Sequence, residues 1–191
     1  MSIQKVTGRV TQVGSIDPGL QFFDCLMPTP YGTTYNSFLI QGDEKTALID
    51  PVQENTVDQL LHNLQEMGVK RLDYIFSLHA EQDHSGAARI LLDRYPEAKI
   101  VASAKVAEFL GVLLHIPQED LMVVAEGDVV DLGGVTLECM PIPFAHWPDN
   151  TMFWMPEERI LFPSDLFGSH YAPDVPDKPD EEIRIQQSRT Y

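Results

Sequence analysis

Short apolar runs alternate with amphipathic stretches along residues 1–172, and turn residues separate many of them. No repeat or linker interrupts the pattern, which predicts one continuous α/β domain over these residues. Three pairs of β-prone runs are close enough in sequence to form antiparallel hairpins. These pairs are 37–41 with 45–49, 129–132 with 135–139, and 151–155 with 160–162.

Three helices and two further strands are predicted between the hairpins. The sequence Thr56-x-x-Gln59 has the form of a capping box, and Ser85 and Ser103 are the expected caps of the two later helices. The predicted helices span 56–67, 85–95 and 103–114, and the predicted buried strands span 72–78 and 99–102.

Acidic residues outnumber basic ones by 29 to 13, which gives a formal net charge of -16. A field of this sign repels phosphate backbones and anionic lipid head groups, so neither nucleic acid nor a membrane is an expected partner. The same charge would arise if acids gathered around a bound cation, because the count omits the ion.

The chain has neither a secretory signal nor an apolar run long enough for a membrane span, so a cytoplasmic location is expected. Cys25 and Cys139 form no metal or redox spacing and are predicted to be buried, reduced thiols. Residues 173–191 are rich in proline and acids and are expected to form an extended tail.

Four side chains that can bind metal follow the predicted strand 72–78 within six residues: His79, Glu81, Asp83 and His84. In an extended segment, His79, Glu81 and Asp83 project to the same side. In a helix, Glu81 would point away from the other two, so a metal site requires this segment to be loop or strand. The alternative is a polar surface turn, but four ligand types directly after an apolar strand favour metal binding.

His146 and Asp165 each follow a predicted hairpin and can complete the ligand set. His62 and His115, in contrast, are interpreted as a solvated helix residue and a residue at a helix C-terminus. Three imidazoles and three carboxylates exceed the needs of one ion and favour two ions about 3.5–4 Å apart, with Asp165 bridging. One ion would take His79, Glu81, His146 and Asp165, and the other Asp83, His84 and Asp165.

The mixture of histidine and carboxylate ligands suits iron or manganese better than zinc. The motifs that carry these ligands resemble the metallo-β-lactamase-like domain of flavodiiron proteins, and the resemblance runs the length of the chain. Glu81 separates it from the related zinc hydrolases, which have a histidine at this place. The matching motifs are His79-x-Glu81-x-Asp83-His84, His146-Trp147-Pro148-Asp149, Asp165-Leu166-Phe167-Gly168-x-His170, Gly32-Thr33-Thr34-Tyr35-Asn36 and Leu48-Ile49-Asp50-Pro51.

The resemblance implies an αββα sandwich of two mixed sheets with flanking helices, C-terminally incomplete. It also implies a non-haem diiron centre that reduces dioxygen to water or nitric oxide to nitrous oxide. One iron would be held by His79, Glu81 and His146, the other by Asp83 and His84, with Asp165 between them.

In the family a further histidine holds the second iron, and its segment would follow Tyr191. His170 is instead expected to hydrogen-bond a ligand, so the second iron is short of one ligand. No flavodoxin-like domain follows, so any flavin mononucleotide would come from another polypeptide. The expected partners are a flavodoxin-like or rubredoxin electron donor and further copies of the chain in a homo-oligomer.

Two other functions fit the same residues. The first is a binuclear zinc or manganese hydrolase that uses metal-bound hydroxide. The second is a non-enzymatic diiron oxygen sensor, which the missing electron-donor domain suggests. Ligand identity leaves the choice between oxygen and nitric oxide open, because this choice depends on pocket geometry and redox potential.

Overall fold

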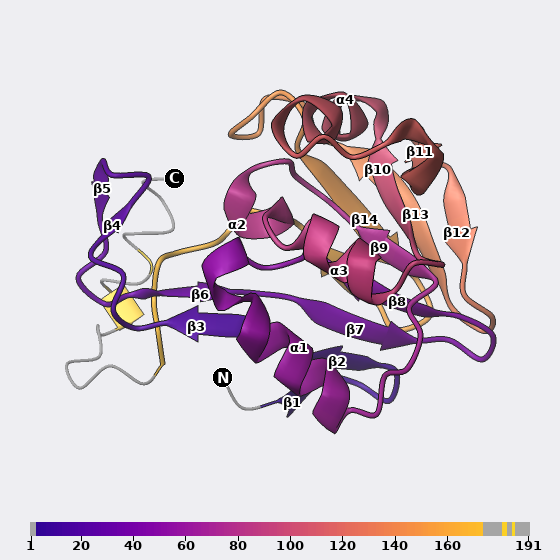
Figure 1. The fold of residues 1–191 in the computed structure, drawn as a ribbon, viewed down its shortest axis with the longest axis horizontal. Coiled ribbons are helices and arrows are strands. Elements are labelled where there is room, and N and C mark those ends of the chain that lie inside the picture. The colour runs from indigo at the N-terminus through magenta and orange to yellow at the C-terminus, as the bar shows by residue number, and fades with distance from the viewer. Residues whose placement is uncertain (1–2, 174–180, 183–184, 186–191) are drawn as a thin grey trace.

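The computed structural model describes residues 3–173, 181–182 and 185. Two stacked sheets form its centre, and helices cover one of them (Figure 1). The first sheet has seven strands in the order β1 (Gln4–Lys5), β2 (Val10–Gln12), β7 (Phe38–Gln41), β8 (Thr46–Ile49), β9 (Tyr74–Phe76), β10 (Lys99–Ser103) and β11 (Leu121–Val124). The second has four, in the order β12 (Val129–Asp131), β13 (Thr136–Pro141), β14 (Thr151–Met155) and β15 (Ile160–Phe162).

Two small pairs of strands lie beside the main sheets. They are β3 (Ser15–Asp17) with β6 (Thr33–Tyr35), and β4 (Phe22–Phe23) with β5 (Met27–Pro28). The helices are α1 (Val57–Glu66), α2 (Gln82–Ser85), α3 (Ala88–Arg94) and α4 (Ala104–Leu113), with short 3-10 turns η1 (Glu54–Thr56) and η2 (Gln118–Asp120).

The first sheet is mixed because its connections change along the chain. β1, β2, β7 and β8 pair antiparallel, as hairpins do, whereas β8 to β11 are parallel and have helices between them. The carboxyl ends of the parallel strands therefore meet at one edge of the sheet. All three predicted hairpins are confirmed as antiparallel pairs.

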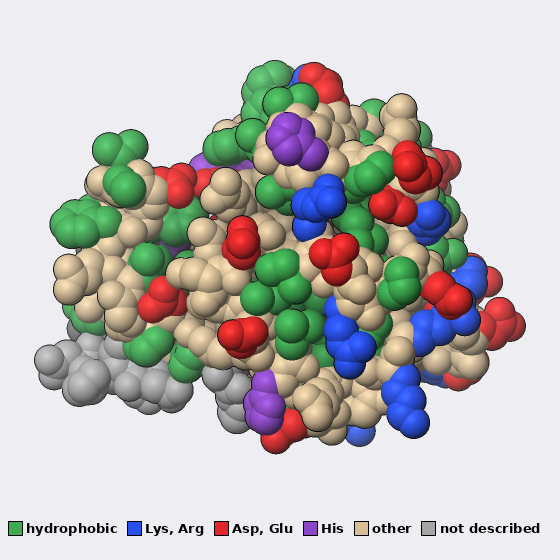
Figure 2. All heavy atoms as spheres, viewed as in Figure 1, with side chains coloured by type: hydrophobic (Ala, Val, Ile, Leu, Met, Phe, Trp, Pro, Cys, Tyr) green, Lys and Arg blue, Asp and Glu red, His purple; other side chains and the backbone are tan. Residues whose placement is uncertain are grey.

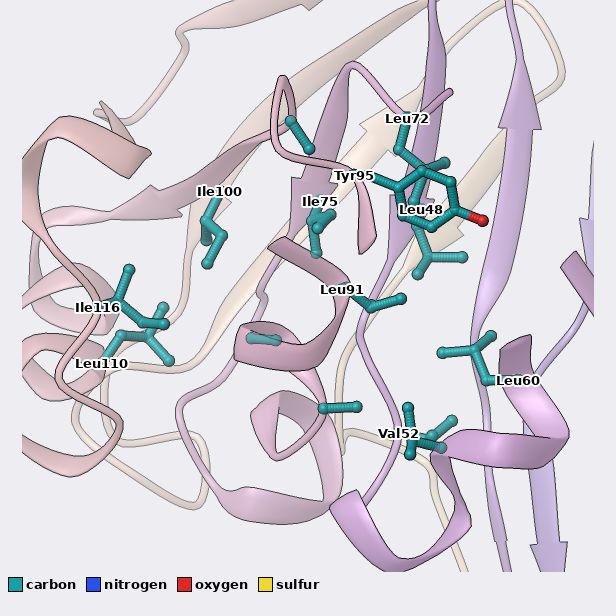
Figure 3. Packing of buried hydrophobic residues seen from close by; sticks show 14 of the residues in the cluster. Leu48, Val52, Leu60, Leu72, Ile75, Leu91, Tyr95, Ile100, Leu110 and Ile116 are labelled. Atoms are coloured by element: carbon teal, nitrogen blue, oxygen red, sulfur yellow. The ribbon is translucent and has the colours of Figure 1, made fainter. Parts of the chain in front are cut away.

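The helices pack on one face of the first sheet. Leu60 of α1, Leu91 of α3 and Leu110 of α4 are completely buried there. They belong to one cluster with Leu48 and Ile75 of the sheet, part of which is drawn in Figure 3. Burying such a side chain stabilises the fold by about 1.5–3 kcal/mol.

The second sheet packs on the opposite face. Inward residues alternate with outward ones along β14, so Phe153 is buried and its ring lies edge-on to that of Phe76, with centroids 4.9 Å apart. This apolar layer joins the two sheets.

The second helical layer of the expected αββα sandwich is not found among the described residues. The helices α1 to α4 all fall before residue 121, whereas the chain from β12 to β15 forms hairpins that leave no crossover. Outward side chains of the second sheet are exposed, among them Val129, Met140 and Leu161.

Two of the expected helix caps are wrong. Thr56 makes no capping hydrogen bond; its hydroxyl donates to Gln53 O, and Gln59 binds the backbone of Ile16. The predicted helix 85–95 is not continuous, because Ser85 is the last residue of α2 and does not begin a helix. Its hydroxyl donates a hydrogen bond to Ala80 O, which precedes it in the chain. The third cap is confirmed, since Ser103 accepts a hydrogen bond from Val106 N.

The charge is unevenly arranged on the surface. On the face drawn in Figure 2, Lys and Arg side chains gather toward one side, whereas Asp and Glu side chains are spread over the face. No helix among the described residues is long and apolar enough to cross a membrane. Cys139 is buried as expected, but Cys25 is exposed at the tip of the β4–β5 hairpin, which corrects that prediction.

The expected extended tail, residues 173–191, lies almost entirely outside the described residues. Glu181, Glu182 and Ile185 are described, and their backbone is helical. The boundary at 172 and the extended tail stay predictions.

Candidate metal centre

Both sheets contribute to one cluster of polar side chains. The segment that carries His79 and Glu81 follows β9 of the first sheet. His146 lies between β13 and β14 of the second sheet, and Asp165 follows β15. Residues from three separate segments therefore meet at one edge of the sandwich.

The first of these segments is only partly extended. Glu81 has extended dihedral angles, φ -60° and ψ 146°, but Asp83 and His84 lie in the helical turn α2. The turn forms because Ser85 N donates to Glu81 O, so the expectation of a continuous loop or strand is wrong for Asp83 and His84. The side chains still converge because the helix begins only after Glu81.

The first ligand group contains His79, Glu81, His146 and Asp165. Glu81 Oε2 lies 3.2 Å from His79 Nε2 and 3.3 Å from His146 Nε2, and Asp165 Oδ2 lies 3.8 Å from each of these nitrogens. One donor atom from each of the four residues lies within 4.8 Å of the others. Ligands at about 2.0–2.2 Å from one ion have separations of this order.

A left-handed backbone brings His146 into the group. Its φ is 82°, an unfavourable value for a residue with a Cβ atom. Asn150 Nδ2 donates to Ala145 O at 2.7 Å, and Phe144 N donates to Trp147 O at 2.9 Å. These bonds hold the loop in a conformation that would otherwise be costly.

The second ligand group contains Asp83, His84 and Asp165. His84 Nε2 lies 2.6 Å from Asp165 Oδ1 and 3.5 Å from Asp83 Oδ2. Asp165 thus turns Oδ2 toward the first group and Oδ1 toward the second. This is the arrangement that a bridging carboxylate requires.

Two aspartates behind the groups orient the imidazoles. Asp149 Oδ2 lies 3.0 Å from His79 Nδ1 and also accepts a hydrogen bond from Ala80 N. In the same way, Asp50 Oδ2 lies 2.9 Å from His84 Nδ1. Each carboxylate contacts the Nδ1 atom of its imidazole, so the Nε2 atom faces the other ligands of the group. The same arrangement is found in many metal sites.

Sequence reasoning missed the roles of Asp50 and Asp149. In the sequence, both residues stand out only as members of the family motifs. One signal could have found them: each acid lies beside the end of a predicted strand, 45–49 or 151–155, at the edge where the ligands were expected.

Burial and neighbouring charges shift the pKa values of the groups in the metal-free site. Burial lowers the pKa of His79, but hydrogen bonds with Asp149 and Glu81 outweigh it and raise the pKa to about 9. Burial raises the pKa of Asp83 to about 6. Burial also opposes ionisation of Asp165, but the neighbouring His84 lowers its pKa to about 2.

This donor set fits cations. Asp165 has a carboxylate oxygen within 4.8 Å of one from Glu81 in the first group and of one from Asp83 in the second, and Asp83 Oδ1 is buried with no hydrogen-bond partner among the described residues. In the absence of a metal, protonated imidazoles balance this negative charge. Divalent ions would replace those protons.

A cavity of about 290 Å³ opens beside the second group. Asp83, His84 and Asp165 line it, and so does His170. His170 Nδ1 lies 2.9 Å from Thr33 Oγ1. Its expected hydrogen bond to a metal ligand stays a prediction.

Trp147 contacts the ligand group, whereas His62 and His115 lie away from it, as expected from the sequence. Trp147 packs edge-on against His79, with ring centroids 5.0 Å apart. His62 is exposed and lies 3.4 Å from Glu66 on the same helix. His115 is also exposed and follows the end of α4.

Several known proteins are similar to this chain in sequence and in fold. Residues 33–184 match the family described as ODP family beta lactamase. Coenzyme F420H2 oxidase of Methanothermobacter marburgensis is 42% identical over 162 residues, which are 81% of this chain and 39% of that protein. Anaerobic nitric oxide reductase flavorubredoxin of Vibrio vulnificus is 35% identical over 164 residues, 84% of this chain and 33% of that protein.

A comparison with solved structures finds a protein of the same type. The flavodiiron protein from Giardia intestinalis superposes with a TM-score of 0.89 at 28% identity, over 99% of this chain and 46% of that one. The chain thus spans less than half the length of these relatives. The metallo-β-lactamase-like fold and the resemblance to flavodiiron proteins are confirmed, and the chain belongs to the ODP family beta lactamase group.

Proposed function

We propose that this chain is the metal-bearing domain of a flavodiiron-type oxidoreductase. It would hold two iron ions and reduce dioxygen to water, nitric oxide to nitrous oxide, or both. The electrons would come from a flavin or rubredoxin donor. The relatives' names, an oxidase and a nitric oxide reductase, support this reaction class.

The position of Asp165 carries the proposal. Its two carboxylate oxygens face different ligand groups, which suits a pair of ions better than a single one. His79, Glu81 and His146 would hold the first iron, and Asp83 and His84 the second. When bound, the two ions would supply electrons and stabilise developing negative charge.

The protein's own contribution is to hold the ions and to orient the side chains that bind them. Asp149 and Asp50 keep His79 and His84 turned inward through their outer ring nitrogens. Trp147 covers one side of His79 and limits the access of water there. Reduction of dioxygen or nitric oxide also consumes protons, which the cavity beside the second group can admit with solvent.

Glu81 is the residue that favours iron over zinc. A carboxylate among the ligands of the first group makes a mixed nitrogen and oxygen set, which suits iron or manganese. Elemental analysis of purified protein tests this assignment. About two irons per chain would support it, whereas stoichiometric zinc or manganese with hydrolysis of thioesters or phosphodiesters would support the hydrolase instead.

Turnover separates the oxidoreductase from the sensor. Iron-loaded protein is mixed anaerobically with reduced rubredoxin or flavodoxin and then with dioxygen or nitric oxide. Repeated oxidation of the donor means catalysis, whereas a single stable coloured adduct means a sensor. The donor, the supply of flavin mononucleotide by another polypeptide and a homo-oligomer stay predictions from the family resemblance.

A further inference from the structure

Ser164 combines two unfavourable features beside the second ligand group. It lies between β15 and Asp165, and its backbone has a φ of 57°, in the left-handed region that disfavours residues with a Cβ atom. Its Oγ atom is also buried without a hydrogen-bond partner among the described residues. An unpaired buried hydroxyl opposes folding, so structure alone gives no reason for it.

The surroundings of Ser164 indicate what the hydroxyl could contact. Ser164 lines the same cavity of about 290 Å³ as Asp83, His84 and Asp165. The carboxylates of that group are hydrogen-bond acceptors when ionised and cannot donate to a ligand. A neutral donor beside them would therefore complement any small ligand that carries lone pairs.

Two other hydroxyls on the cavity wall are already engaged. Thr33 Oγ1 pairs with His170 Nδ1, and Thr34 Oγ1 donates to Tyr171 O. Ser164 Oγ has no such partner. The Oγ atom is buried in this rotamer, so a ligand in the cavity reaches it when the side chain turns about its Cα–Cβ bond toward the cavity.

We propose that the Ser164 hydroxyl donates a hydrogen bond to a small anion or diatomic molecule held at the group formed by Asp83, His84 and Asp165. Ser164 is thus a positioning residue, which orients the ligand without holding the metal. This inference rests on the proposed function, because the ligand needs a metal ion in that group.

Azide is a suitable probe because it is a small anion that binds open positions on iron. The dissociation constant of azide is measured by absorbance titration of the iron-loaded chain for the parent and three variants. Ser164→Ala removes the hydroxyl and keeps the Cβ atom, whereas Ser164→Gly removes the hydroxyl and relaxes the backbone. Ser169→Ala, elsewhere on the cavity wall, is the matched control.

Both Ser164 variants should bind azide about three- to tenfold more weakly than the parent, as expected for one lost hydrogen bond. Ser169→Ala should bind like the parent. The midpoint of thermal unfolding of the metal-free protein should not fall in Ser164→Ala, because an unpaired hydroxyl is removed. Iron content should be the same in all four proteins.

Several results would overturn the proposal. Unchanged azide affinity in Ser164→Ala means that the hydroxyl does not contact the ligand. A lower unfolding midpoint in metal-free Ser164→Ala means that the hydroxyl has a structural partner, and a change in Ser164→Gly alone assigns the effect to the backbone. A parent protein without iron would refute the proposed function itself, before any variant is compared.

Discussion

Two carboxylates that would touch no metal decide where the imidazoles of this centre point. Asp149 binds the outer nitrogen of His79, and Asp50 that of His84. Asp149 also accepts a hydrogen bond from Ala80 N, and Asp50 accepts one from Leu78 N, so the same two carboxylates position the backbone around His79. Side chain and main chain are thus oriented together.

Replacing these carboxylates should weaken metal binding while leaving all six proposed ligands in place. We expect Asp149→Asn and Asp50→Asn each to raise the dissociation constant for a divalent ion by about 10–100-fold. An amide can present its N–H₂ group to the ring nitrogen and so favour the wrong tautomer. Competition with a chromophoric chelator measures the affinity. Asp43→Asn, at a surface ion pair with Arg9, is the control, and equal affinities in all variants would contradict the assignment.

Metal uptake by the metal-free protein should depend on pH. The pKa of His79 is about 9 and that of Asp83 is about 6, and both groups must lose their protons to bind an ion. Affinity for zinc should therefore rise as the pH is raised from about 6 to about 9, with fewer protons released at the higher pH. Calorimetry in buffers of different ionisation enthalpy measures both quantities. An affinity for zinc that does not change over this pH range would contradict these pKa values.

The two thiols should react at very different rates. Cys25 is exposed, whereas Cys139 is buried between the sheets, where burial raises its pKa to about 11. We expect Ellman's reagent to label one thiol per folded chain at once and the second only after denaturation. Cys25→Ser should abolish the fast phase, and a fast phase that persists in this variant would show that Cys139 is accessible.

Among single residues, the proposed ligands are easier to recognise in the sequence than the carboxylates that orient them. His79 and Glu81 lie close together in sequence, so their chemistry is visible as a motif. Asp149 lies 70 residues from the imidazole that it orients, and Asp50 lies 34 residues from its own. Spacing carries no information about contacts of that kind.

Among the elements, hairpins were predicted well and helix caps less well. A hairpin depends on neighbouring residues, so the pairing of 37–41 with 45–49 could be read from the sequence. The cap at Thr56 failed because tertiary partners compete for its hydroxyl, which lies 2.7 Å from Ser15 Oγ. The helix α2 has only four residues and no periodicity that could predict it.

Ser103 should be the helix cap with a measurable effect on stability. Its oxygen accepts hydrogen bonds from Val106 N and from Thr151 Oγ1 of the second sheet. Ser103→Ala should lower the free energy of unfolding by about 1–2 kcal/mol, measured by urea denaturation. Ser103→Thr retains the oxygen and should lose less. A loss as large in Ser103→Thr as in Ser103→Ala would assign the effect to packing instead.

For the whole molecule, the resemblance was more informative than the pattern. The pattern predicted an α/β domain with antiparallel hairpins, but it did not say that hairpins 37–41 and 129–132 belong to different sheets. That division depends on which sheet faces pack together, and the contact between Phe76 of one sheet and Phe153 of the other is an example. A linear sequence does not reveal such partners.

Metal should stabilise the whole domain, because the proposed ligands come from both sheets. An ion present at about 100 times its dissociation constant adds about 2.7 kcal/mol to the free energy of unfolding. We expect the midpoint of thermal unfolding to rise on loading and to fall again with a chelator. Asp165→Asn, which weakens the bridging position, should show a smaller rise. An equal rise would mean that the ions bind elsewhere.

The separation of the ligand segments also sets the order in which a growing polypeptide could acquire its ions. Four ligands lie within residues 79–84, but Asp165 follows 81 residues after His84. During synthesis the early cluster leaves the ribosome long before the bridging carboxylate exists. A nascent chain would therefore offer a half-built site, where copper or zinc would outcompete iron by intrinsic affinity. If the two ions are iron, as proposed, correct loading favours an iron supply that acts on the completed polypeptide.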